Sequence, residues 1–383
     1  MPTSRHTWSF PTRMEYGPGA AKDIAGIIKQ TGVKNGLLVT DEGLVKIGLP
    51  AALAQHFKDE GMQLEIFSNV KSNPTDDNVF EGSTLYKECG AEFIVALGGG
   101  SPIDVAKVIK LLATHEGPLE QYDDMKGGSN LIKNNMPPVY AIPTTAGTGS
   151  EVGRSSVITL KSTNKKTIIF SPYFMPTIAV LDPEYTVSLP PKLTAATGVD
   201  AFVHNIEAYL IDDFHPFADG LAKEGILRSF KNLPTAVKNG QDIAARGEML
   251  VASSMGATAF QKGLGVNHSI AHALGVFYDI HHGLANASVL VEVLKFNLKN
   301  DIVRNKMAAL GQILGTQNDA DAVVEAIKDW LLSIDMPTDV KGIGIKTEDL
   351  PAIEEYALED PCCPMNPQKV EKGDVTRILQ NIL

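Results

Sequence analysis

The chain has 383 residues, which is longer than a single hydrophobic core usually grows, so we expect two domains. Apolar residues make up 44% and charged residues 21% of the sequence, and no apolar run approaches the roughly 20 residues that cross a bilayer. The formal net charge is −11, and the sequence contains no extended cluster of basic residues. This composition predicts a soluble globular protein and argues against a membrane or a nucleic acid as a partner.

The amino-terminal residues and the cysteines predict the compartment. The first residues lack the apolar segment of a secretory signal. The three cysteines, Cys89, Cys362 and Cys363, cannot form a disulfide framework, and two of them are adjacent. We therefore expect a cytoplasmic protein.

The amino-terminal half alternates short apolar segments with helical stretches. This order is typical of a parallel sheet covered by helices. Two further β-rich segments, residues 155–160 and 166–170, flank a polar stretch and predict an inserted hairpin. The predicted strands of the parallel sheet cover residues 36–40, 64–67, 93–97, 139–142 and 178–181.

A glycine-rich turn follows the predicted strand 93–97. Residues 98–104 read Gly-Gly-Gly-Ser-Pro-Ile-Asp and lead directly into a helical segment. Backbone N–H groups at such a helix start can approach a phosphate closely, because glycine has no Cβ, and the helix dipole favours the negative charge. The turn thus favours phosphate binding over a merely tight turn.

Two other strand ends carry polar groups, although the usual G-x-G-x-x-G fingerprint is absent. Asp41 follows the first predicted strand, where a carboxylate can bind an adenosine ribose and repel a 2′-phosphate, or simply cap a helix. Residues 143–151, Pro-Thr-Thr-Ala-Gly-Thr-Gly-Ser-Glu, supply hydroxyls and backbone donors after another strand. Ligands of open α/β sheets bind at these carboxyl ends.

The strand signals stop after Pro191, and apolar residues then recur at helical spacing. We place the domain boundary near Ser188. Residues 1–188 are expected to form a Rossmann-like, parallel-sheet α/β domain, and residues 189–383 an all-helical domain.

Histidines concentrate in the second half. Four of the nine in the chain lie within fifteen residues, and Asp200 and His204 are spaced to share one face of a helix. His268 and His272 repeat that spacing on a second predicted helix. One carboxylate and several imidazoles suggest a metal centre, to which the adjacent His281 and His282 could not easily both contribute.

These segments together resemble the iron-dependent, group III alcohol dehydrogenases, which have the dehydroquinate synthase-like fold. The resemblance runs nearly end to end and includes residues 98–104, 143–151 and 195–204 and the two histidine segments, 267–272 and 278–283. It implies that the metal ligands are Asp200, His204, His268 and His282. It also implies a catalytic His272 beside the substrate and no ligand role for His281.

The resemblance further implies NAD and a divalent metal as cofactors. Fe²⁺ is expected and Zn²⁺ is the alternative, because three imidazoles and a carboxylate accept either ion. The assembly implied is a homo-oligomer, most simply a dimer. The residues implied to bind the dinucleotide, in a cleft between the domains, are Asp41, Asn73, Gly99, Gly100, Ser101, Asp104, Thr144, Thr145, Ser150, Val152, Lys166 and Leu189.

The predicted reaction interconverts an alcohol and an aldehyde or ketone. The divalent ion would act as a Lewis acid on the hydroxyl, and NAD would accept the hydride. Two cations near the motifs, Arg154 and Lys262, are either solvated surface charges, as most lysines and arginines are, or they bind the anionic end of a substrate such as 4-hydroxybutyrate. A lyase or cyclase on the same fold and a catalytically silent metal-binding protein are the other hypotheses.

Overall fold

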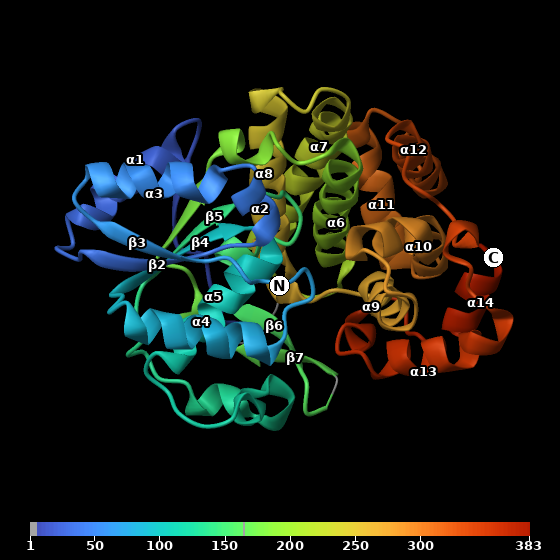
Figure 1. Ribbon diagram of the computed structural model, residues 1–383. Helices are drawn as coiled ribbons and strands as arrows, with labels where there is room; N and C mark the ends of the chain where they lie inside the picture. The colour runs from blue at the N-terminus through green and yellow to red at the C-terminus, as the bar shows by residue number, and fades with distance from the viewer. Residues whose placement is uncertain (1–5, 164) are drawn as a thin grey trace. The chain divides into compact units, whose positions relative to one another are not determined.

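The computed structural model describes residues 6–163 and 165–383, which form two compact units (Figure 1). The sheet unit contains Phe10–Thr145 and Gly149–Ser188. The helical unit contains Leu189–Leu383, together with residues 6–9 and Ala146–Thr148. No described helix is long and apolar enough to cross a membrane.

The sheet unit is built on six parallel strands in the order β1-β8-β5-β4-β2-β3. The strands are β1 (Arg13–Tyr16), β2 (Asn35–Val39), β3 (Gln63–Phe67), β4 (Phe93–Gly98), β5 (Val139–Pro143) and β8 (Ile178–Leu181). Every residue of β4 and β5 is buried, as continuous apolar runs in a covered parallel sheet require. The predicted parallel sheet is therefore confirmed.

Helices cover both faces of this sheet (Figure 1). Leu38 and Val95 belong to the core formed with α1 and α3, whereas the neighbouring Leu37 and Ile94 belong to the core formed with α4 and α5. This separation follows from the alternation of side chains along a strand. The helices are α1 (Ala20–Lys29), α2 (Glu42–Lys46), α3 (Leu49–Asp59), α4 (Asp76–Glu88) and α5 (Gly100–Leu112).

The predicted hairpin is also present. Strands β6 (Ser155–Leu160) and β7 (Lys165–Phe170) pair antiparallel, with Ser155 opposite Phe170. Three short 3₁₀ segments lie between α5 and β5: η1 (Leu119–Tyr122), η2 (Asp124–Lys126) and η3 (Gly128–Leu131).

The regular structure of the helical unit, over the residues described, consists of helices alone, which confirms the predicted helical carboxyl-terminal region. Its central helix is α6 (Pro191–Leu210), which packs on α7, α8 and α10 and is buried along nearly its whole length from Thr194. The other α-helices are α7 (Pro216–Lys238), α8 (Ile243–Ala259), α9 (Val266–Tyr278), α10 (His282–Asn297), α11 (Asp301–Leu314), α12 (Ala320–Ser333), α13 (Leu350–Glu359) and α14 (Asp374–Gln380).

Candidate metal centre and cofactor residues

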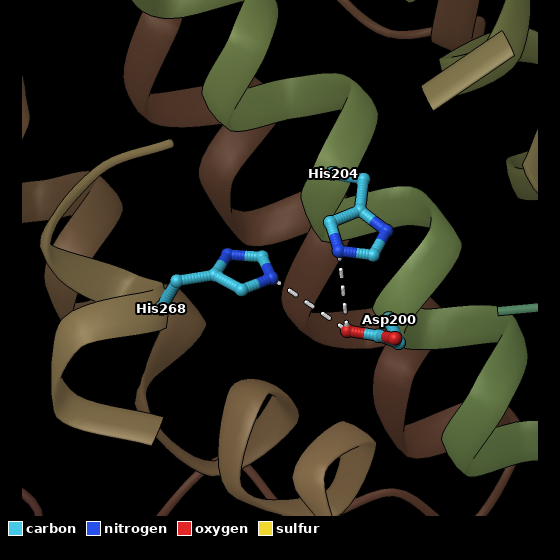
Figure 2. A group of neighbouring side chains, drawn as sticks. All are labelled: Asp200, His204 and His268. Atoms are coloured by element: carbon cyan, nitrogen blue, oxygen red, sulfur yellow. Dashed lines mark ion pairs between the residues drawn. The ribbon is translucent and has the colours of Figure 1, made fainter. Parts of the chain in front are cut away.

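Three imidazoles surround one carboxylate oxygen in the helical unit. The Nε2 atoms of His204, His268 and His282 lie 3.8, 3.7 and 3.3 Å from Asp200 Oδ1. Figure 2 shows His204 and His268 directed toward Asp200 from two different helices. The ligand atoms of Asp200, His204 and His268 all lie within 4.8 Å of one another, and these three residues are buried.

Three helices supply these side chains. Asp200 and His204 occupy successive turns of α6, His268 lies in the first turn of α9, and His282 begins α10. Gly283 allows α10 to approach α6 closely, because a Cβ at this position would lie 1.9 Å from Ala196 O. The glycine after His282 is therefore a condition for placing this imidazole beside Asp200.

Burial and charge set the protonation of the cluster. Burial raises the pKa of Asp200, but the three imidazoles outweigh it and hold this pKa well below its usual value. Burial lowers the pKa of His204 to about 4 despite the nearby carboxylate. Burial also opposes protonation of His268, but the charges of Asp200 and Glu207 raise its pKa to about 9. A metal ion binding there would have to displace the His268 proton.

The ring nitrogens of His204 and His268 are arranged as metal ligation requires. His204 Nδ1 lies 3.2 Å from Gly147 O, and His268 Nδ1 lies 2.5 Å from Glu207 Oε2, so both Nδ1 atoms donate to acceptors. Within residues 6–163 and 165–383, no atom forms a hydrogen bond with the buried Nε2 of His268. An unpaired buried nitrogen aimed at a carboxylate and other imidazoles fits a divalent transition metal. The four predicted ligands thus lie together around Asp200 Oδ1, with Asn286 Nδ2 3.2 Å from His282 Nε2.

Two polar neighbours of this cluster, Glu207 and Asn286, were not predicted from the sequence. Glu207 follows Asp200 by seven residues and His204 by three, so helical spacing alone could have placed it on the same face. Asn286, four residues after His282, donates to Asp200 Oδ1 at 2.8 Å. These two contacts were not predicted, because each joins side chains of two different helices and depends on how those helices pack.

His272 and His281 occupy different positions relative to the cluster. The His272 ring stacks on that of His282 with 5.2 Å between centroids, and its Nδ1 lies 2.8 Å from Asp360 Oδ2. Burial raises the pKa of Asp360, but the interactions with His272 prevail and lower it to about 2. His281 is exposed and immediately precedes α10.

Lys262 and Arg154, the two cations predicted to bind a substrate anion, have different surroundings. Lys262 is buried, and its Nζ donates to Asp219 Oδ1 at 2.6 Å and to Ile211 O at 2.9 Å. The expectation that Lys262 binds a substrate anion is therefore wrong, because its charge is already neutralised within the helical unit. Arg154 is half-buried in the sheet unit, with its guanidinium 5.5 Å from the centre of the Phe170 ring.

The glycine-rich turn begins α5 in the sheet unit. Gly99 is the N-cap residue and Gly100 the first helical residue, so the N-cap position has no side chain that could cap this helix start. Thr144 N donates to Gly98 O at 3.0 Å, which joins the two predicted strand-end motifs. Ser101 Oγ donates to Ser72 O at 2.7 Å, beside the predicted Asn73. Thr145 also lies at the turn, because a Cβ on Gly99 would be 3.3 Å from its Oγ1.

Asp104, in α5, accepts hydrogen bonds from two segments that pack against the glycine-rich turn. Its Oδ1 accepts a hydrogen bond from Ser150 Oγ at 2.6 Å, and its Oδ2 accepts one from Val157 N at 2.9 Å. The buried Lys107 donates to Ser150 Oγ at 2.8 Å and to Ser155 O at 2.9 Å. These contacts fit a role for Asp104 and Ser150 in holding the turn in place.

The four remaining predicted cofactor residues lie in separate settings. Asp41 caps α2, with its Oδ1 accepting from Leu44 N at 3.0 Å. Val152 is buried in η4 (Ser150–Val152), and Lys166 lies on β7. Leu189 belongs to the helical unit.

Known proteins resemble this chain over nearly its full length. Residues 11–183 match the family described as iron-containing alcohol dehydrogenase, and residues 194–383 match the carboxyl-terminal domain of the same family. The chain is 39% identical to 4-hydroxybutyrate dehydrogenase of Cupriavidus necator, over 97% of this chain and 98% of that protein.

Solved structures agree with this match. A 1,3-propanediol oxidoreductase structure is 35% identical, with a TM-score of 0.93 over 99% of this chain and 100% of that one. A sulfoacetaldehyde reductase from Bifidobacterium kashiwanohense in complex with NAD⁺ is 28% identical, with a TM-score of 0.91 over 99% of each chain. The chain therefore belongs to the iron-containing alcohol dehydrogenase family and is an oxidoreductase acting on CH–OH groups.

Proposed function

We propose that this protein is an NAD-dependent dehydrogenase of an ω-hydroxyacid of the 4-hydroxybutyrate type. The observation that supports the reaction most directly is the cluster of three imidazoles around Asp200 Oδ1. The observation that supports the substrate class is the 39% identity to a 4-hydroxybutyrate dehydrogenase along almost the entire chain. The overall change oxidises the terminal CH–OH group to an aldehyde, reduces NAD⁺ to NADH and releases one proton.

The cofactors are NAD and a divalent metal, expected to be iron and held by Asp200, His204, His268 and His282. When bound, the metal supplies Lewis acidity that lowers the pKa of the substrate hydroxyl. His272 is the proposed catalytic residue. Asp360 fixes its Nδ1 as the donor, which leaves Nε2 as the nitrogen that can accept or return the hydroxyl proton.

Arg154 is the cation we propose for the carboxylate end of the substrate. Among the residues described, no carboxylate forms an ion pair with its guanidinium, which stacks on Phe170 instead. A guanidinium can bind a carboxylate through two parallel hydrogen bonds, and hydrogen bonds to charged groups contribute about 1.5–3 kcal/mol. Lys262, paired with Asp219, has no such role.

The test compares kcat/KM for 4-hydroxybutyrate and for 1-butanol, an uncharged alcohol of equal chain length, by NADH formation. We expect the ratio of the two kcat/KM values to be well above one. In Arg154→Ala it should fall roughly 10- to 100-fold, because kcat/KM for 4-hydroxybutyrate falls while that for 1-butanol does not change. Arg304→Ala is the control, because Arg304 is an exposed residue paired with Asp321. A ratio near one in the unmodified enzyme would instead indicate a dehydrogenase of plain alcohols or diols.

A further inference from the structure

The amino terminus of α9, which presents His268, is capped by side chains from elsewhere in the helical unit. Its own N-cap residue is Gly265, which has no side chain to accept a hydrogen bond. Glu207 Oε1 on α6 accepts from Asn267 N at 2.9 Å, and Asn366 Oδ1 accepts from Val266 N at 3.1 Å. Two of the first backbone donors of α9 are thus satisfied across the fold.

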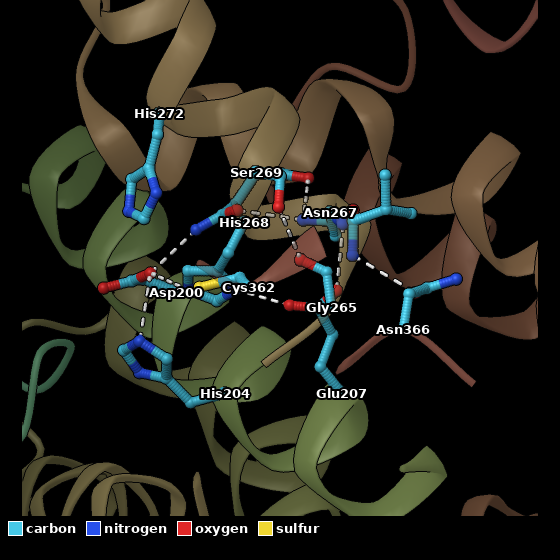
Figure 3. Close-up of polar contacts among 12 residues, drawn as sticks. Asp200, His204, Glu207, Gly265, Asn267, His268, Ser269, His272, Cys362 and Asn366 are labelled. Atoms are coloured by element: carbon cyan, nitrogen blue, oxygen red, sulfur yellow. Dashed lines mark hydrogen bonds and ion pairs between the residues drawn. The ribbon is translucent and has the colours of Figure 1, made fainter. Parts of the chain in front are cut away.

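The second oxygen of the same carboxylate contacts His268, a member of the candidate metal site. Glu207 Oε2 lies 2.5 Å from His268 Nδ1, and the Glu207 side chain is only 4% exposed. Figure 3 shows Glu207 between the start of α9 and the His268 ring. One buried carboxylate therefore controls both the helix that carries the ligand and the orientation of its imidazole.

Gly265 leaves room for this arrangement. A Cβ at Gly265 would lie 2.8 Å from Glu207 Oε1 and 2.6 Å from Asn366 Oδ1. Both distances are too short for an alanine unless the capping groups shift. The absence of a side chain at the N-cap therefore allows the carboxylate to approach the backbone of α9.

We propose that Glu207 is a positioning residue for the metal ligand His268. By accepting a hydrogen bond from Nδ1–H, it keeps that proton on Nδ1, so that Nε2 is the nitrogen that a metal ion would bind, directed at the cluster where Asp200 Oδ1 lies 3.7 Å away. A carboxylate behind a ligating imidazole fixes its tautomer and increases its basicity, and losing such a partner typically costs about 10- to 100-fold in metal affinity. This inference rests on the metal set of the proposed function.

The informative variant is Glu207→Gln. The amide has nearly the same shape, but it has one acceptor oxygen where the carboxylate has two. Either Asn267 N–H or the His268 Nδ1–H would then face an NH₂ group. The Kd for Zn²⁺ and Co²⁺ should rise about 10- to 100-fold, and the visible absorption of the Co²⁺ protein should change.

The matched control is Glu354→Gln. Glu354 is another buried carboxylate of the helical unit, and it accepts from Gly373 N at 2.7 Å and from Thr376 Oγ1 at 3.0 Å. Both variants lose one acceptor in a buried network, so both are expected to lower the thermal stability of the metal-free protein. Only Glu207→Gln should weaken metal binding.

The measurement is metal retention by the holoenzyme against a series of chelator concentrations, with metal content determined by elemental analysis. Metal affinity unchanged in Glu207→Gln would overturn the proposal, even if thermal stability fell. If that variant does not fold, Gly265→Ala serves instead, since it keeps the carboxylate but displaces it. It should weaken metal binding several-fold, and an unchanged Kd would equally overturn the proposal. Failure of the metal set itself would appear separately, as metal retention by His268→Ala.

Discussion

Two adjacent histidines, His281 and His282, have very different surroundings. His282 Nε2 lies 3.3 Å from Asp200 Oδ1, whereas His281 is exposed at the start of α10. Because the chain turns into α10 at this point, neighbouring positions project in different directions. The pair therefore provides a proposed ligand and a control that differ by a single position.

We predict that His282→Ala loses most of its metal and that His281→Ala keeps it. Removing one of four ligands should raise the metal Kd by more than the roughly 10- to 100-fold typical of supporting residues. Elemental analysis after gel filtration measures the occupancy of each variant. Equal metal content in the two proteins would show that His282 is not a ligand.

Asp41 has two predicted roles, helix capping and the choice between NAD and NADP. Its Oδ1 caps α2 through Leu44 N, as one of its two predicted roles requires. The other predicted role is to repel the 2′-phosphate of NADP by charge. The two roles can be separated, because asparagine retains a capping oxygen without the charge.

We predict that Asp41→Asn lowers the ratio of kcat/KM for NAD to that for NADP by roughly tenfold or more, which corresponds to at least about 1.4 kcal/mol. Thermal stability should change little, since asparagine and aspartate are equally good N-caps. Asp41→Gly should relax the cofactor preference similarly. If wild-type enzyme already turns over NADP better than NAD, Asp41 does not select the cofactor.

At the scale of elements, α5 combines the glycine-rich turn with buried lysines. The Lys107 side chain is fully buried, and burial lowers its pKa from 10.5 to about 8 despite the nearby carboxylates of Asp104 and Glu151. Burial also lowers the pKa of Lys110 to about 8. A helix that contains two such residues should be sensitive to pH in the alkaline range.

The sign of this effect follows from proton binding. Between pH 8 and 10.5 the unfolded chain keeps the Lys107 proton and the folded chain releases it, so the free energy of unfolding rises with pH. As the pH falls through about 8, this contribution is lost. We predict that Lys107→Met removes up to about 1.4 kcal/mol per pH unit from that slope.

Urea unfolding of the wild-type and variant proteins across this pH range gives the two slopes. Lys46→Met is the control, because Lys46 is exposed and its side chain is 76% accessible. Its slope should match that of the wild type. Parallel slopes for Lys107→Met and the wild type would mean that Lys107 is not desolvated in solution.

At the scale of the whole molecule, the proposed metal ligands come from α6, α9 and α10 of one unit. A ligand that binds only the folded state stabilises it by about 2.7 kcal/mol at a hundredfold excess over Kd. We predict that the Tm of the helical unit is roughly 5–10 °C lower after the metal is removed by a chelator than with the metal at a hundredfold excess over Kd. Calorimetry with and without chelator measures the change.

Amide hydrogen exchange shows which helices lose stability when the metal is removed. Peptides from α6, α9 and α10 should lose protection when the metal is removed, whereas peptides from β4 and β5 should not. Uniform loss across both units would contradict a metal site confined to the helical unit.

The homodimer and the cytoplasmic location stay predictions. Light scattering would measure the oligomeric state.

Much of the fold was predictable from consecutive residues. The apolar runs of β4 and β5 and the β-rich segments of β6 and β7 are local patterns, and each of them is a strand in the structure. The edge strand β1 (Arg13–Tyr16) was not predicted, because its four residues form no apolar run and its strand character depends on pairing with β8. Pairing partners far along the chain leave no local signal.

The sequence by itself determined the fold class, the family and the residue types of the metal cluster, because periodicity and motif spacing are properties of neighbouring positions. Only the tertiary structure decided which charges are paired. It joined Glu207 to His268 and Asp360 to His272, and it buried Lys262 against Asp219. These pairs are separated by 43 to 88 residues. Whether a charged side chain is free to bind a ligand depends on such distant partners.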